Sequence, residues 1–197
     1  MSNGDVSQGR RRFLIGATSV VGGVGVVGAA VPFVASWNPS AKAEAAGAPV
    51  TVNVSKIEPG QQITTEWRGK PVWIVRRTEQ MLENIEKLNG EVKDPQSEAP
   101  QQPQYIEGIY RSIKPEIAVI VGLCTHLGCV PSYRPEVAPA DLGEDWLGGF
   151  FCPCHGSHYD LAGRVYQAQP APLNLEVPPY RYDDDVTLTI GLDPEAA

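Results

Sequence analysis

The sequence predicts an all-β head of antiparallel strands with one short helix, preceded by a single helix that crosses a membrane. Three observations predict this fold class. Short segments of alternating apolar and polar residues recur from residue 50 onward, one stretch of that region has helical periodicity instead, and a long uncharged apolar run comes before them. With 197 residues, 42% of them hydrophobic, the chain can bury one core of ordinary domain size.

The apolar run near the N-terminus predicts the membrane span. No charged residue occurs from residue 13 to residue 41, and residues 13–37 form a run of 25 that can cross a hydrocarbon core of ~30 Å as a helix. A cleaved signal peptide is the alternative, with Ala41-Lys42-Ala43 as its cleavage site. The apolar region of such a peptide is usually only about 7–15 residues long, so the length favours a retained anchor.

The residues before the apolar run predict its orientation. Gly9-Arg10-Arg11-Arg12-Phe13-Leu14 is similar to a twin-arginine export signal, which directs folded proteins out of the bacterial cytoplasm. Positive residues favour the cytoplasmic side of a membrane helix, so we expect residues 1–12 to form a cytoplasmic arm and the head to lie in the periplasm. The expected location is the bacterial inner membrane, crossed once.

The charge of the chain excludes one class of partner. The formal net charge is −7, and the arm of residues 1–12 carries +2, which leaves −9 on the rest of the chain. Nucleic acids require a basic protein face, so we expect no nucleic acid as a partner. An acidic head instead suits a partner with a basic docking surface, or serves solubility alone.

Residues 38–49 predict a flexible tether between the anchor and the head. They contain no large apolar side chain, so they can bury little surface against either part. Good helix formers occupy residues 42–46, and we expect the tether to exchange between helical and extended forms. The head is expected to span residues 50–197.

The first part of the head predicts an antiparallel meander and the single helix. Residues 50–54 alternate strictly, and we expect them to pair in a meander with residues 62–67 and 71–77. Residues 78–88 follow a helical pattern, with Thr78 as the N-cap and Asn89-Gly90 as the stop.

The rest of the head predicts shorter elements. We expect a surface excursion at residues 91–104, a buried strand at 116–123, an irregular insertion at 131–147, strand pieces at Tyr159, 165–166 and 173–177, a turn at 183–185 and a closing strand at 186–190.

Two short motifs contain all four cysteines and two of the three histidines. They are Cys124-Thr125-His126-Leu127-Gly128-Cys129 and Cys152-Pro153-Cys154-His155-Gly156-Ser157. A Cys-x-His pair, followed one loop later by a Cys-x-x-His pair, offers two thiolates and two imidazoles. That count suits a structural zinc site and an iron–sulfur centre equally well, so it leaves both open.

The two motifs, the second continued by His158-Tyr159, resemble those of Rieske proteins, and in particular of the iron–sulfur subunits of the cytochrome bc1 complex. The resemblance implies a Rieske-type β head with a cluster-binding subdomain inserted at about residues 124–172. It also implies one [2Fe–2S] cluster, with Cys124 and Cys152 on one iron and His126 and His155 on the other.

The resemblance assigns roles to further residues. Cys129 and Cys154 are implied to form a disulfide between the two loops. Ser157 and Tyr159 are implied to donate hydrogen bonds to the cluster's sulfur atoms, and Gly128 and Gly156 to lie next to the ligands. Leu127, beside His126 and His155, is implied to contact the docked quinol. Pro170, Ala171 and Pro172 are implied to form a proline loop that shields the cluster. Gln169 departs from the family pattern, which often has glycine there, and His158 has no matching role.

The implied ligand set makes the cluster easy to reduce. Two ferric ions and two sulfides sum to +2, so four thiolates leave an oxidised cluster at −2, whereas two thiolates and two imidazoles leave it at 0. Such mixed centres have potentials within about −150 to +300 mV, against roughly −400 mV for plant-type centres with four cysteines. An imidazole on ferric iron also loses its second ring proton more readily than a free one, so an electron can travel with a proton.

The resemblance finally implies the reaction and the partners. A cytochrome bc1 complex is a dimeric quinol–cytochrome c reductase in which this subunit takes an electron from quinol at cytochrome b, passes it to cytochrome c1 and contributes to the proton-motive force. The chain alone is then an electron carrier, because catalysis needs cytochrome b.

Two other hypotheses stand beside this one. A structural zinc module leaves the second cysteine pair and Gly156-Ser157-His158-Tyr159 without a purpose. A Rieske component of another enzyme is the second, either an oxygenase ferredoxin or the small subunit of arsenite oxidase. Oxygenase ferredoxins typically lack the extra cysteine pair and the anchor. The match from Cys124 through Pro178, proline loop included, favours the bc1 complex over arsenite oxidase.

Overall fold

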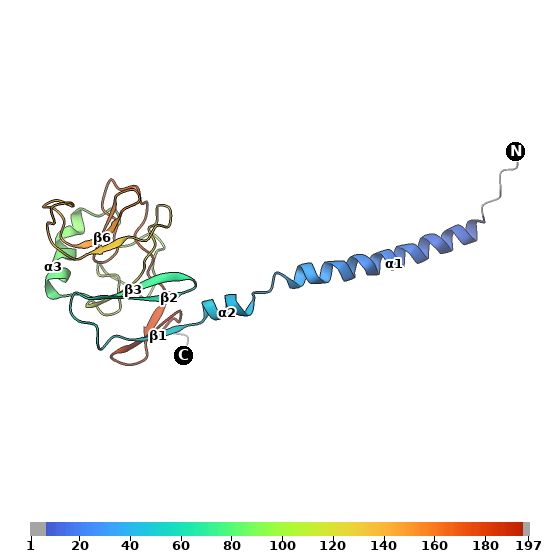
Figure 1. Cartoon of the computed structure of the whole chain (residues 1–197), viewed down its shortest axis with the longest axis horizontal. Coiled ribbons are helices and arrows are strands. Elements are labelled where there is room, and N and C mark those ends of the chain that lie inside the picture. The colour runs from blue at the N-terminus through green and yellow to red at the C-terminus, as the bar shows by residue number, and fades with distance from the viewer. Residues whose placement is uncertain (1–6, 195–197) are drawn as a thin grey trace. The chain divides into compact units, whose positions relative to one another are not determined.

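The computed structural model describes residues 7–194. The first six residues of the predicted arm and the last three of the predicted head lie outside the described residues. The chain divides into two compact units, with the boundary between Ala45 and Ala46. The first unit contains the predicted anchor, and the second contains the head (Figure 1).

The long helix of the first unit, α1, spans Gln8–Ala35. It is long and apolar enough to cross a membrane, and none of its residues is buried. It covers the predicted span of residues 13–37 except for the last two residues, and it begins earlier, so Arg10, Arg11 and Arg12 lie in its first turns.

The second helix, α2, is short and spans Ala41–Gly47 within the predicted tether. Ser40 caps it, because its Oγ accepts a hydrogen bond from the Ala43 N–H at 3.2 Å. The Ala46 carbonyl accepts a bond from the Arg68 N–H at 2.8 Å, so the end of this segment is already attached to the head. Residues 41–46 are exposed, and Gly47 is half-buried.

Within residues 7–194 the strands of the head form three antiparallel sheets of three strands, which confirms the predicted fold class. The first sheet has the order β1 (Val50–Asn53), β9 (Thr187–Ile190) and β8 (Tyr180–Tyr182). The second has the order β2 (Gln62–Trp67), β3 (Lys70–Arg76) and β4 (Ile117–Val121). The third has the order β5 (Ser132–Arg134), β6 (Gly149–Cys152) and β7 (Ser157–Asp160).

The predicted meander is correct for β2 and β3 and wrong for β1. β2 and β3 pair in register, and β4 extends them. β1 instead pairs with the closing strand β9, with Val50 opposite Ile190 and Val52 opposite Leu188. Alternation indicates that a strand has one buried face, but tertiary packing decides which strand lies beside it.

The helix of the head, α3, spans Glu79–Lys87 and confirms the predicted helix. The Thr78 side chain accepts a hydrogen bond from the Met81 N–H at 3.3 Å and so caps the first turn. Met81 and Ile85 are buried on the inner face, and a 3-10 turn, η1 (Leu88–Gly90), ends the helix at the predicted place.

The predicted irregular insertion at residues 131–147 contains a strand and a buried anchor, so that prediction was partly wrong. β5 pairs with β6, with Tyr133 opposite Phe150. Trp146 is only 2% exposed and donates its indole N–H to the Arg134 carbonyl at 3.1 Å. Prolines on both sides of β5 hide its short pattern in the sequence.

The predicted strand piece at residues 173–177 is wrong, although Leu175 and Val177 are buried as a strand residue would be. The Leu175 N–H bonds to the Gly163 carbonyl and the Val177 N–H to the Gln101 carbonyl, at 2.7 and 2.8 Å. These two partners belong to irregular segments, and the Glu176 carbonyl accepts the Val121 N–H of β4 at 2.8 Å, so the chain contacts the end of β4 without forming a strand of its own.

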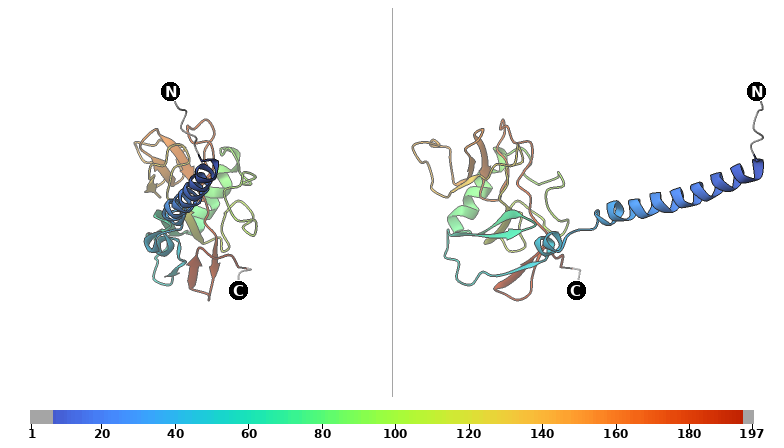
Figure 2. Two further views of the ribbon diagram at one scale, coloured as in Figure 1. Left: turned by 90° about the vertical axis from the view of Figure 1, so that its right-hand side faces the viewer. Right: turned by 45° about the vertical axis from the view of Figure 1, so that its right-hand side comes forward.

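β3 and β4 form the centre of the head, because they bury side chains on both faces. Val72 and Ile74 pack in one core cluster, while Trp73 and Val75 pack in a second, which also contains Cys124. Figure 1 shows β6 and β1 at opposite ends of the head with β2 and β3 between them. Figure 2 keeps this order, with the orange strands at the top and red β8 and β9 at the bottom. The central strand β4 leads directly to the first cysteine motif.

Candidate metal centre

The first cysteine loop follows β4 and closes on itself. The Cys124 N–H donates to the Cys129 carbonyl at 2.7 Å, and the Gly128 N–H donates to the Cys124 carbonyl at 2.9 Å. Gly128 has a φ of +78°, which residues with a Cβ rarely adopt. Glycine therefore allows the tight turn that raises His126 and Leu127 above Cys124.

The second cysteine loop repeats this turn between β6 and β7. Cys152 is the last residue of β6, and Ser157, opposite it in the pairing register, is the first of β7. The Gly156 N–H donates to the Cys152 carbonyl at 2.9 Å, and Gly156 has a φ of +76°. Each loop thus has a buried cysteine at its base and a histidine in the turn.

A disulfide joins the two loops. It links Cys129 and Cys154, whose Cα atoms are 6.7 Å apart, and it confirms the implied pairing. The two cysteines are 25 residues apart in sequence, and on the chain-entropy model such a crosslink contributes about 3 kcal/mol to stability. The bridge holds the two histidine turns side by side.

The other two cysteines are free thiols in the core. Cys124 is 3% exposed and Cys152 is 1% exposed. The sulfur atoms of Cys129, Cys152 and Cys154 lie within 4.8 Å of one another, but two of them are joined in the disulfide. Since a disulfide has no thiolate to offer, that trio is not a ligand set, and Cys124 and Cys152 are the available sulfur donors.

The two imidazoles face each other at the loop tips. The ring centroids of His126 and His155 are 4.6 Å apart, with the rings nearly perpendicular. His155 is exposed, whereas His126 is half-buried. The Nδ1 atom of His126 is buried and has no hydrogen-bond partner among residues 7–194. A buried ring nitrogen without a partner fits a metal ligand, because buried polar atoms are otherwise bonded.

The Tyr159 hydroxyl links the Cys124 sulfur to Thr125. The Tyr159 Oη lies 3.2 Å from Cys124 Sγ and accepts the Thr125 N–H, also at 3.2 Å. The Thr125 hydroxyl donates to the Leu173 carbonyl at 2.6 Å, so its proton is not available to Tyr159. The phenol proton of Tyr159 is therefore left for Cys124 Sγ or for the Thr125 oxygen, 3.2 Å away.

The two thiols differ in acidity. Burial acts to raise the pKa of the Cys124 thiol, but hydrogen bonds from Tyr159, the His126 backbone, Cys152 and Ser157 outweigh it, so the pKa is lowered. Burial raises the pKa of Cys152. Burial also raises the pKa of Tyr159, which keeps its phenol protonated as a donor.

The proline loop covers the base of the second cysteine loop. Ser157 is 0% exposed, and its Oγ accepts the Ala171 N–H at 3.1 Å. Ala171 is buried, whereas Pro170 and Pro172 are exposed on either side of it. The tip of the first cysteine loop is open, since Leu127 is 71% exposed.

Two family models match the chain. One is described as "Rieske [2Fe-2S] domain" and covers residues 90–180, and the other as "Ubiquitinol-cytochrome C reductase Fe-S subunit TAT signal" and covers residues 1–40. The ubiquinol–cytochrome c reductase iron–sulfur subunit of Allochromatium vinosum is 56% identical over 193 residues, which are 98% of this chain and 93% of the relative. The chain belongs to the Rieske iron–sulfur subunits of ubiquinol–cytochrome c reductase. It therefore carries one Rieske [2Fe–2S] cluster.

Two further proteins that resemble this chain are of the same kind. The subunit of the same name from Rhodospirillum rubrum is 44% identical and covers 92% of this chain and 91% of its own. A chain of a solved hyperthermophilic respiratory Complex III is 29% identical, with a TM-score of 0.48 over 90% of this chain and 98% of that one. These matches do not favour the alternative hypothesis from the sequence, in which the chain is the small subunit of arsenite oxidase.

The contacts of Thr125 were not predicted from the sequence. Thr125 lies inside the first motif, yet its contacts with Tyr159 and Leu173 link the ligand loop to the segment after the proline loop. Its place between Cys124 and His126 was the available signal.

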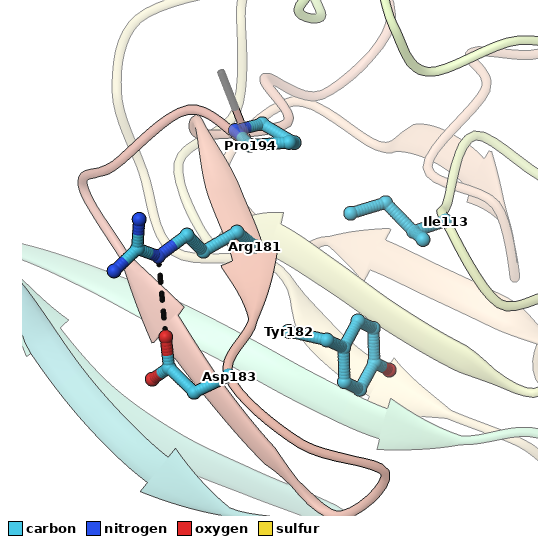
Figure 3. A pocket seen from close by; sticks show the side chains of 5 residues that line it. All are labelled: Ile113, Arg181, Tyr182, Asp183 and Pro194. Carbon is cyan, nitrogen blue, oxygen red and sulfur yellow. Dashed lines mark hydrogen bonds and ion pairs between the residues drawn. The ribbon is translucent and has the colours of Figure 1, made fainter. Parts of the chain in front are cut away.

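The hollow shown in Figure 3 is lined by no residue of the two cysteine loops. It encloses about 380 Å³ against the strand β8 and is lined by Ile113, Arg181, Tyr182, Asp183 and Pro194. Arg181 and Asp183 pair with each other at 3.2 Å. This hollow contains none of the residues implied in ligation, so it is not the metal centre.

The contact between Tyr159 and Cys124 yields a prediction. Tyr159→Phe keeps the ring and removes one hydrogen bond that favours the more negative, reduced cluster. A hydrogen bond worth about 0.5–1.5 kcal/mol corresponds to roughly 20–65 mV in a one-electron couple. We expect a redox titration followed by electron paramagnetic resonance to show a fall of that size, with the cluster retained. An unchanged potential would place the hydroxyl proton on Thr125 instead of on the sulfur.

Proposed function

We propose that this subunit takes one electron at a time from a quinol at cytochrome b and passes it to cytochrome c1, by way of a cluster held by Cys124, Cys152, His126 and His155. The observation that carries the proposal is the unpartnered, buried Nδ1 of His126, which lies beside the imidazole of His155 and above two buried free thiols.

The cluster supplies a one-electron acceptor of high potential, because two neutral imidazoles replace two negative thiolates. The chain adds hydrogen bonds that favour negative charge on the sulfur atoms. Tyr159 donates toward Cys124, and Ser157 is fully buried with its hydroxyl beside the same cysteine. Both stabilise the reduced state and raise the potential.

The proton of the quinol is accepted at the loop tips. His155 is exposed, and Leu127 next to His126 is 71% exposed, so a quinol can approach the imidazoles across an apolar contact. A histidine that uses Nδ1 as a ligand keeps Nε2 free to accept the hydroxyl proton of the quinol. Oxidation of a quinol releases two electrons and two protons, and this subunit takes one of each.

The first unit supports the proposed position in the membrane. α1 anchors the chain, and Arg10, Arg11 and Arg12 favour a cytoplasmic N-terminus with the head in the periplasm, across the bacterial inner membrane. Proton release on that side contributes to the proton-motive force. As a subunit of the bc1 assembly, the chain is expected in a dimeric complex.

Residues 38–49 would let the head serve two partners. A head that would exchange electrons both with quinol at cytochrome b and with cytochrome c1 has to reach two places. Residues 41–46 of α2 are exposed, so their helix is not held by packing. A residue spans about 1.5 Å in a helix and up to roughly 3.3–3.6 Å when extended, so unwinding lengthens the tether.

The function is tested in membranes that lack a Rieske subunit but contain cytochromes b and c1. We expect this chain to restore quinol-dependent reduction of cytochrome c, and His155→Ala to abolish both that activity and the mixed-ligand resonance signal. His158→Gln, which changes the third histidine, should keep the signal. Restoration of the activity by His155→Ala would contradict the proposal.

The tether yields a second prediction in the same membranes. Prolines at Lys42 and Glu44, or deletion of residues 42–45, should slow quinol-to-cytochrome electron flow several-fold, because the reach can no longer change. The potential and spectrum of the cluster should not change. Full turnover in such variants would show that the head does not move, and a shifted potential would show that the tether is misplaced.

A further inference from the structure

Gln169 stands where the related pattern often has glycine, directly before the proline loop, and its side chain makes a specific contact. The Oε1 atom accepts the backbone N–H of His158 in β7 at 3.2 Å. A glycine at this position has no atom that can make this bond. The contact therefore distinguishes this chain at a point next to the metal centre.

The bond is one of a series along the edge of β7 that does not pair with β6. Val165 forms a bridge with Tyr159, and the Tyr166 N–H donates to the His158 carbonyl at 3.1 Å. Gln169 then accepts the His158 N–H, and the Ala171 N–H donates to the Ser157 hydroxyl at 3.1 Å. Residues 165–171 thus follow β7 backward from Tyr159 to Ser157.

The series is interrupted at Gln167 and Ala168, which are exposed and lie outside the pairing. Ala168 has a φ of +54°, so the backbone turns away from β7 here. The carboxamide of Gln169 provides the acceptor for His158 after this detour and returns the chain to the strand just before Pro170.

The far end of the series controls a hydroxyl group. A serine hydroxyl has two lone pairs and one proton. When the Ala171 N–H occupies one lone pair of Ser157, the proton is directed away from Ala171, and Ser157 is 0% exposed, so no solvent competes for it. Ala171 is held on its other side by Lys93, whose Nζ donates to the Ala171 carbonyl at 3.1 Å.

We propose that Gln169 is a positioning residue that fixes the proline loop against β7, and thereby sets the direction of the Ser157 hydroxyl and the midpoint potential of the cluster. This inference rests on the proposed role of Ser157 as a donor to the cluster's sulfur atoms. Gln169 touches neither the ligands nor the substrate in this scheme and acts through Ala171 and Ser157.

A matched control lies two residues away. The Gln167 side chain donates to the Gly90 carbonyl at 2.9 Å and is exposed, in the same loop but without a contact to β7. The test compares Gln169→Leu, Gln167→Leu, Ser157→Ala and the double variant Ser157→Ala/Gln169→Leu. Each is expressed as the full chain in its complex, and the midpoint potential is measured by redox titration.

We expect Gln169→Leu to lower the potential, in the same direction as Ser157→Ala and by a smaller amount. The double variant should match Ser157→Ala alone, because without the hydroxyl Gln169 has nothing to orient. Gln167→Leu should leave the potential unchanged. Hydrogen exchange should report several-fold faster exchange of the peptide containing Ala171 in Gln169→Leu and not in Gln167→Leu.

Three results overturn the inference while leaving the role of Ser157 intact: no fall in Gln169→Leu, an equal fall in Gln167→Leu, or a further fall in the double variant. If Ser157→Ala does not lower the potential, the proposed donor role fails, and the route proposed for Gln169 fails with it. Should Gln169→Leu not retain the cluster, Gln169→Gly removes the same acceptor without a bulky side chain and is measured in its place.

Discussion

The metal centre depends on keeping two short loops, far apart in sequence, at one end of the head. The Cys129–Cys154 disulfide is the direct link between them. Their bases are held separately, because Cys124 and Cys152 are both part of the core cluster that contains Trp73, Phe150 and Tyr159. A covalent bond therefore joins the two loops directly, and hydrophobic packing joins their bases.

Buried arginines hold the irregular segments around this end of the head. Arg111 is 0% exposed and donates to the carbonyls of Ala162 and Leu175, at 3.0 and 2.7 Å. Arg164 is equally buried, pairs with Asp160 at 2.7 Å and donates to the Ile85 carbonyl of α3 at 2.6 Å. Charged hydrogen bonds of this kind give segments without sheet pairing a defined position, and residues around the cluster need that precision.

The sequence predicted the strands whose alternation is strong and missed the elements that depend on distant partners. Residues 62–67 were predicted with the bounds that β2 has, whereas β1 was assigned to the wrong sheet because nothing local specifies β9 as its partner. Residues 173–177 were predicted as a strand piece, but the N–H groups of Leu175 and Val177 bond to irregular segments and no strand forms. Periodicity reports which side chains are buried and not where the backbone bonds go.

The ligand residues show a similar limit. Residue count and spacing left zinc and iron–sulfur open, and the four cysteines looked alike until the resemblance assigned two of them to a disulfide. The structure separates them physically, since two are buried free thiols and two are bonded to each other. The contact of Gln169 with β7 could not be predicted, because it needs the detour of Ala168 to bring the carboxamide to His158.

The central claim is that two imidazoles and two thiols, and no other combination of these residues, hold the cluster. The most direct measurement is electron–nuclear double resonance on the reduced protein with its histidines labelled with nitrogen-15. The account predicts couplings from two inequivalent histidine nitrogens to the cluster spin. A single coupled nitrogen, no nitrogen coupling, or a protein that contains zinc and gives no resonance signal would contradict it.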